Sequence, residues 1–150
     1  MILENLEKPG NIGAILRTAS AIGVDAVFFC DEKIDLYNPN IVRSSLGSVF
    51  NNNIAISNTK SIISWLKKKQ IKIFPTSVRE SAQRLYNINF KNIPLAIVIG
   101  QEKKGLSKVW FKEASDIIQI PIKNKYIDSL NVSNATAIIL FEIYRQKCFT

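Results

Sequence analysis

Residues 97–108 read IVIGQEKKGLSK, an apolar run that ends at Gly100 and is followed by a second glycine at Gly105. This outline is close to that of a P-loop, whose backbone cradles phosphates and whose lysine reaches the outer ones. The glycine spacing fits, but Leu106 stands where the lysine must be, and the chain contains no dinucleotide-binding G-x-G-x-x-G. The stretch therefore predicts a ligand-binding turn after a buried strand, with the carboxylate of Glu102 in it, and not a phosphate site.

Short apolar runs alternate with helical patterns along the rest of the chain. The runs are rich in Ile, Val and Phe without polar alternation, as in strands with both faces covered. They predict strands at residues 26–30, 54–56, 71–74, 95–100 and 117–120. The helical patterns predict helices at residues 11–22, 39–46, 60–69, 106–114 and 132–147. We therefore expect a single α/β domain, residues 1–150, with a mostly parallel sheet and helices on both faces.

The charge is unevenly distributed. Twenty Lys and Arg residues against twelve Asp and Glu give a net charge of +8, and residues 60–91 hold eight basic residues and one acid. Such a basic segment suits a polyanion such as RNA, although a solvated lysine-rich helix face would look the same.

Several residue types are scarce or missing. The absence of histidine removes the commonest general base and the commonest metal ligand, so no metal site is expected. Cys30 and Cys148 are far apart and are expected to be free thiols of a cytoplasmic protein. No apolar run is long enough for a membrane span.

Two further polar segments interrupt the apolar pattern. The first, EKPGNIGAILRTASAIG (7–23), carries Arg17 as the one charged residue between positions 9 and 24, and Asn11 is expected to cap its helix. In the second, which begins IQIPIKNKYIDSLNVSNA (118–135), four small polar residues precede an apolar helix. Capping needs only one or two of them, so these residues favour a site.

The three segments, in this order, resemble the three motifs of the SpoU (TrmH-type) branch of the SPOUT RNA methyltransferases. The similarity spans residues 4–146. It implies a deep trefoil knot in the C-terminal part, a homodimer with helix 132–147 at its interface, and S-adenosylmethionine as the cofactor. The implied reaction is methyl transfer to a ribose 2′-hydroxyl of tRNA or rRNA, without a metal or a membrane.

The resemblance also implies roles for individual residues. Asn11 and Arg17 would serve the hydroxyl, and Glu102 would be the carboxylate of the second motif. The residues expected to contact the cofactor are Thr76, Ser77, Gly100, Ile120, Ser129, Leu130 and Asn131, of which Ser129 and Asn131 also belong to the catalytic set. The residues expected to contact RNA phosphates are Arg43, Lys67, Lys68, Lys69, Lys72, Arg79 and Arg84.

Two other interpretations remain at this point. The chain could be a knotted RNA-binding module without catalysis, or a nucleotide-binding enzyme of another class. Many members of the family carry an additional N-terminal RNA-binding domain, so the sequence is expected to be either a minimal catalytic domain or one domain of a longer protein.

Overall fold

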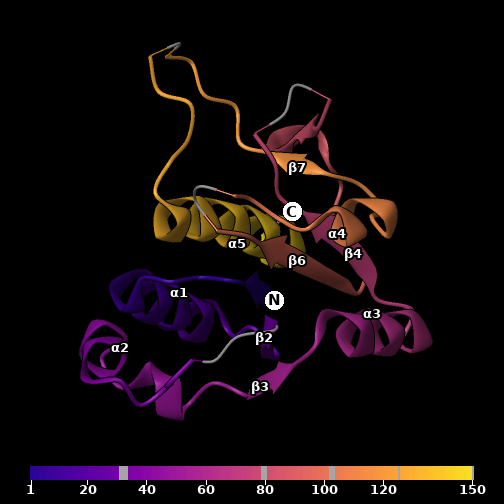
Figure 1. The fold of residues 1–150 in the computed structure, drawn as a ribbon. Coiled ribbons are helices and arrows are strands. Elements are labelled where there is room, and N and C mark those ends of the chain that lie inside the picture. Colours follow the sequence, from indigo (N-terminus) through magenta and orange to yellow (C-terminus); the bar gives the residue numbers. More distant parts are fainter. Residues whose placement is uncertain (31–33, 79–80, 102–103, 125, 150) are drawn as a thin grey trace.

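The computed structural model describes residues 1–30, 34–78, 81–101, 104–124 and 126–149 (Figure 1). Within them, the central sheet has five strands in the order β3-β2-β1-β6-β4, and every neighbouring pair is parallel. The strands are β1 (Ile2–Glu4), β2 (Val27–Cys30), β3 (Ile54–Ser57), β4 (Lys72–Pro75) and β6 (Leu95–Ile99). The prediction of an α/β domain with a parallel sheet is confirmed.

Helices cover both faces of this sheet. On one face lie α1 (Pro9–Ile22) and α5 (Val132–Cys148), with α2 (Pro39–Ser44) packed on α1. The other face is covered by α3 (Thr59–Lys68) and α4 (Lys108–Lys112). Alternation along the strands divides the core accordingly, since Leu3 packs with the α1 and α5 side chains while Ile2 packs with Trp110 of α4.

A second, two-stranded sheet lies beside the main one. It pairs β5 (Gln83–Arg84) with β7 (Ile118–Gln119) in parallel, and a bridge between Thr76 and Ile118 connects it to the end of β4. The strand predicted at 117–120 is therefore present in shorter form, but it pairs outside the main sheet. The apolar run indicates a buried strand, but the identity of its partner is set by tertiary packing. Two short 3-10 helices, Ser48–Phe50 and Leu85–Asn87, complete the described elements.

Helix ends differ from expectation in two places. Helix α1 begins at Pro9 with Lys8 as the N-cap, so Asn11 lies in the first turn and does not cap the helix. Proline suits this first position because its missing N–H would have no partner there. Helix α2 ends at Ser44, before Leu46 and Gly47 adopt positive φ angles of 50° and 77°.

The crossing of α1 and α2 depends on Gly13. A Cβ at this position would lie 1.9 Å from Ser44 Oγ and 2.7 Å from Ile41 O. Because a backbone oxygen cannot rotate away, we expect Gly13→Ala to lower the free energy of unfolding by about 1–3 kcal/mol. Urea denaturation would measure the loss. Gly10→Ala is the matched control, since nothing lies within 4 Å of its Cβ, and equal stabilities of the two variants would contradict this packing.

A buried polar network holds α5 against residues 88–90. Gln146 Oε1 accepts from the Phe90 N–H at 2.8 Å, and Gln146 Nε2 donates to Ile88 O at 3.0 Å and to Glu142 Oε1 at 2.8 Å. The Arg145 guanidinium also donates to both carboxylate oxygens of Glu142. The network thus ties the C-terminal helix to a segment more than fifty residues earlier in the chain.

This network predicts a pH effect on stability. Hydrogen bonding from Arg145 lowers the pKa of Glu142 below its ordinary value of 4.5. The carboxylate therefore contributes stability that is fully present above pH 4.5 and is lost as the pH falls through the lowered pKa. Urea unfolding between pH 7 and pH 3 should show the parent and Glu142→Gln converging at the acidic end. A difference that widens there would contradict the assignment.

Candidate cofactor-binding and catalytic site

A cavity of about 300 Å³ opens at the carboxyl ends of β4 and β6. In parallel sheets these ends share one edge, which is where ligands of α/β proteins bind. Six of the seven residues expected to contact the cofactor line it: Thr76, Ser77, Gly100, Ile120, Ser129 and Leu130. The seventh, Asn131, lies between two lining residues in the sequence, Leu130 and Val132. The fold thus gathers side chains that are up to 54 positions apart.

Backbone hydrogen bonds fix the loop after β4 against its neighbours. Thr76 donates to Val98 O through both its N–H, at 3.0 Å, and its hydroxyl, at 3.1 Å. Ser77 N–H donates to Ile118 O at 2.9 Å. These bonds hold one wall of the cavity between β6 and β7, so its shape does not rest on a free loop.

The described residues 100–101 and 104–107, called here the 100–107 turn, close on one another. Gly105 N–H donates to Gln101 O at 2.9 Å, and Gly105 has a φ of 67°, which favours glycine. A Cβ on Gly100 would lie 2.7 Å from Gly105 C, so glycine is needed here for the turn itself. Leu106 packs against the core under α3 and α4. The position of a P-loop lysine is thus occupied by a side chain that faces the protein interior.

The first and third motifs meet at the start of α5. Asn131 caps this helix by accepting from Ser133 N–H at 2.9 Å, and its Nδ2 donates to Asn11 Oδ1 at 3.1 Å. Ser133 Oγ also donates to Asn131 Oδ1, at 2.6 Å. A single asparagine therefore both caps the helix and orients the side chain of Asn11, which explains why small polar residues crowd this point.

A second, larger cavity of about 840 Å³ lies on the other side of the 100–107 turn. It shares Gln101, Lys104, Gly105 and Leu106 with the first cavity. Its remaining lining residues come mainly from the end of β1 and from the loops around α1 and α2, and include Glu4, Asn5, Glu7, Pro9, Asp35 and Asn38. Sequence reasoning did not identify Glu4 or Glu7, although a carboxylate at the end of the apolar run MILE was a visible signal.

Other predicted site residues do not join these cavities. Arg17 is exposed on α1 and lines neither one. Glu102 and Arg79, expected in the catalytic and RNA-binding sets, lie outside the described residues.

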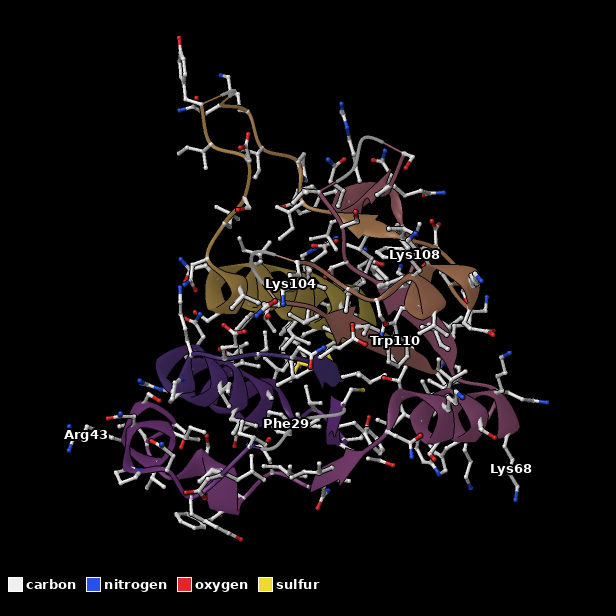
Figure 2. All side chains as sticks on the ribbon, in the orientation of Figure 1. Phe29, Arg43, Lys68, Lys104, Lys108 and Trp110 are labelled. Atoms are coloured by element: carbon white, nitrogen blue, oxygen red, sulfur yellow. The ribbon has the colours of Figure 1, made fainter. Side chains whose placement is uncertain are left out.

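The basic residues that the structure describes are exposed but do not form one surface. Figure 2 shows Arg43 and Lys68 on opposite sides of the molecule. Lys67 forms a salt bridge with Glu113, which leaves it less available to a phosphate. Lys69 follows α3, Lys72 begins β4 and Arg84 ends β5.

Two features are missing from the described residues. No helix in this part of the chain has the length and hydropathy required to cross a lipid bilayer. The same residues contain no cluster of three or more His, Cys, Asp or Glu side chains suited to hold a metal ion.

Residues 1–141 match the model of the SpoU rRNA Methylase family. A Borreliella burgdorferi protein named "Uncharacterized tRNA/rRNA methyltransferase" is 37% identical over 97% of this chain and 63% of its own length. The Coxiella burnetii "23S rRNA (guanosine-2'-O-)-methyltransferase RlmB" is 32% identical over 98% of this chain and 58% of its own length.

Solved structures agree with this result. A Sinorhizobium meliloti rRNA methyltransferase with bound AdoMet superposes with a TM-score of 0.90 at 33% identity, over 96% of this chain and 54% of that one. The chain therefore spans little more than half the length of these relatives. Because the family model covers nearly the whole sequence and the folds agree, the chain belongs to the SpoU rRNA methylase family.

Proposed function

We propose that this domain transfers a methyl group from S-adenosylmethionine to a ribose 2′-hydroxyl of tRNA or rRNA. The observation that carries the proposal is the first cavity, which is lined by six of the seven residues expected to contact the cofactor. Names of relatives support it, since one is a 23S rRNA 2′-O-methyltransferase and another is an rRNA methyltransferase with AdoMet bound. We place the activity in the cytoplasm and assign it to residues 1–150 as one domain.

The chemistry of the cavity fits S-adenosylmethionine. Apolar side chains such as Ile99, Phe111 and Ile139 offer a surface for the adenine ring. The hydroxyls of Thr76 and Ser77 add a few polar contacts. The cofactor carries no phosphate, which agrees with a turn that has no P-loop lysine.

Catalysis then depends on positioning and on charge. The bound cofactor supplies an activated methyl group on its sulfonium. Asn11 and Asn131, held together by their hydrogen bond, would orient the ribose hydroxyl. The guanidinium of Arg17 stays protonated in proteins, so we assign it to stabilising the developing alkoxide, while the proton leaves to phosphate or water. Glu102 is the proposed site carboxylate, and Ser129 completes the set.

We further propose that the C-terminal part is knotted. Two contacts support a threaded arrangement around residues 77–90. Strand β7 pairs with β5 within this stretch, and Gln146 of α5 hydrogen-bonds to Ile88 and Phe90. Two segments that follow β6, namely β7 and the end of α5, thus return to contact the part of the chain that precedes β6.

A homodimer would complete the site. Phe141, Tyr144 and Phe149 form an exposed aromatic cluster along α5, with ring centroids 6.5 Å and 5.5 Å apart. The outer face of α1 carries Arg17 between two small residues that would allow close approach, namely Ala14 and Ala21. We propose that these surfaces meet in the dimer and bring Arg17 of one protomer to the cavity of its partner.

The dimer predicts the outcome of a surface substitution. Phe141 is 52% exposed, so Phe141→Asp should not disturb the core, but it would bury a charge at the interface. Sedimentation velocity should show a shift from dimer to monomer. Asn87→Asp adds the same charge at an exposed position outside α5 and should stay dimeric. A Phe141→Asp protein that remains dimeric would show that another surface forms the interface.

RNA binding is proposed for the exposed basic residues. Arg43, Lys68, Lys69, Lys72 and Arg84 are free to meet phosphates in the described structure, and Arg79 completes the predicted set. Lys67 would first have to leave Glu113.

The function is tested directly by a tritiated-methyl assay on unmodified total RNA. Transfer of label to alkali-resistant dinucleotides would support ribose 2′-O-methylation. RNA binding without transfer would favour the inactive RNA-binding module instead. A calorimetric titration that showed binding of ATP but not of S-adenosylmethionine would favour an unrelated nucleotide-binding enzyme.

A further inference from the structure

The carboxylate of Glu4 is buried at the end of β1, where the residue is only 2% exposed. Its Oε1 accepts from Ser107 Oγ and from the indole Nε1 of Trp110, each at 2.8 Å. Its Oε2 accepts from the Ser107 backbone N–H, also at 2.8 Å. All three donors come from the start of α4, so one side chain of the first strand holds the beginning of a helix more than a hundred residues later.

These bonds fix one end of the 100–107 turn. Its other end is fixed by β6, which pairs with β1 and β4 in the middle of the sheet. Between these two anchors, the turn contributes Gln101, Lys104 and Gly105 to both cavities. A shift of Ser107 would therefore move the wall that separates the two cavities.

We propose that Glu4 is a positioning residue that holds the 100–107 turn in place and thereby sets the affinity of the first cavity for S-adenosylmethionine. It contacts protein donors and not the reacting groups, so it acts through the turn. The inference rests on the proposed function, because it concerns that function's cofactor cavity.

Because three donors surround the carboxylate, the Glu4→Gln substitution tests this hydrogen-bond pattern directly. Glutamine keeps the shape of glutamate but replaces one acceptor oxygen with an amide NH₂. If the NH₂ points at the Ser107 N–H, two donors face each other. If it is flipped, it can donate to the Ser107 hydroxyl, but it then faces the Trp110 indole N–H. In either orientation a buried donor loses its acceptor, and the turn must move to relieve it.

Isothermal titration well below the melting temperature tests the proposal. We expect Glu4→Gln to raise the Kd for S-adenosylmethionine by about tenfold or more. The kcat at saturating cofactor should stay within about twofold of the parent, because Glu4 does not contact the reacting groups. Gly13→Ala is the control for general destabilisation, since Gly13 lies at the α1–α2 contact, away from the turn, and it should leave the Kd unchanged.

A rescue experiment separates the hydrogen-bond pattern from simple loss of stability. Trp110→Phe removes the indole donor, so the flipped amide of Glu4→Gln would then meet no unsatisfied group. Glu4→Gln should therefore raise the Kd less in the Trp110→Phe background than in the parent. Should Glu4→Gln fail to fold, Ser107→Ala removes one of the three bonds and should raise the Kd severalfold.

The outcomes discriminate between the two proposals. An unchanged Kd in Glu4→Gln, or in Ser107→Ala where that variant replaces it, overturns the role of Glu4 and leaves the proposed function intact. An equal rise in Gly13→Ala also overturns it, because the effect would then be one of global stability. A parent protein that binds no S-adenosylmethionine overturns both the proposed function and this inference.

Discussion

Replacing Arg17 with alanine is expected to lower the rate of methyl transfer at least about 100-fold, which is the cost of removing one fixed donor from a developing oxyanion. The affinity for S-adenosylmethionine should stay near that of the parent, because Arg17 is exposed on α1 and lines neither cavity. A tritiated-methyl assay would measure turnover, and calorimetry would measure cofactor binding.

A positive charge alone at position 17 is not expected to support methyl transfer. Arg17→Lys keeps the positive charge but lacks the planar guanidinium fork, so it should recover little of the lost rate. If the alanine variant also lost cofactor binding, the role in alkoxide stabilisation would be wrong.

Mixing Arg17→Ala with an inactive Asn131→Ala protein tests whether Arg17 acts across the proposed dimer. Recovery of activity in mixed dimers would show that the two residues act from different protomers.

Gly100→Ala should weaken S-adenosylmethionine binding by about tenfold or more. Its Cβ would lie 2.7 Å from Gly105 C and 2.8 Å from both Leu106 N and Leu106 Cγ. Two of these three atoms belong to the backbone of the same turn, so the clash cannot be relieved by one side-chain rotation. Overpacking of this kind costs about 1–3 kcal/mol, and the turn would relieve it by moving into the cavity that it lines.

Calorimetry and thermal melting distinguish a loss of cofactor affinity in Gly100→Ala from a loss of global stability. We expect a loss of cofactor affinity together with a melting temperature only a few degrees below that of the parent, since the strain is local. Gly10→Ala serves as the control, because its Cβ meets nothing within 4 Å and Gly10 lines neither cavity. Parent-like affinity in Gly100→Ala would mean that the turn is not part of the cofactor site.

Local patterns were enough to predict most of the elements. The apolar runs at 26–30 and 95–100 became β2 and β6, and the helical pattern at 60–69 became α3. The same patterns do not show which strand a segment will pair with, or at which residue a helix begins. The run at 117–120 pairs with β5 outside the main sheet, and Pro9, not Asn11, begins α1.

Some residues of the candidate site could be predicted from the sequence, and others could not. The resemblance carried by the motifs predicted that Thr76, Ser77 and Leu130 contact the cofactor, and the fold gathers these side chains around one cavity. The resemblance gave Gly100 only a predicted contact with the cofactor, whereas the structure shows that glycine is needed for the turn to close. Sequence reasoning also missed Glu4, because nothing in the sequence of a short strand shows which donors its carboxylate will meet.

The sequence by itself determined most of the strands and helices in their order along the chain, the parallel α/β class and the absence of a P-loop lysine. These properties depend on residue type, spacing and periodicity, which are local and can be read along the chain. Only the tertiary structure decided that Asn131 bonds Asn11, that Glu4 holds Ser107, and that one turn separates two cavities. Each of these contacts joins residues more than a hundred positions apart or depends on strand order, and packing alone determines them.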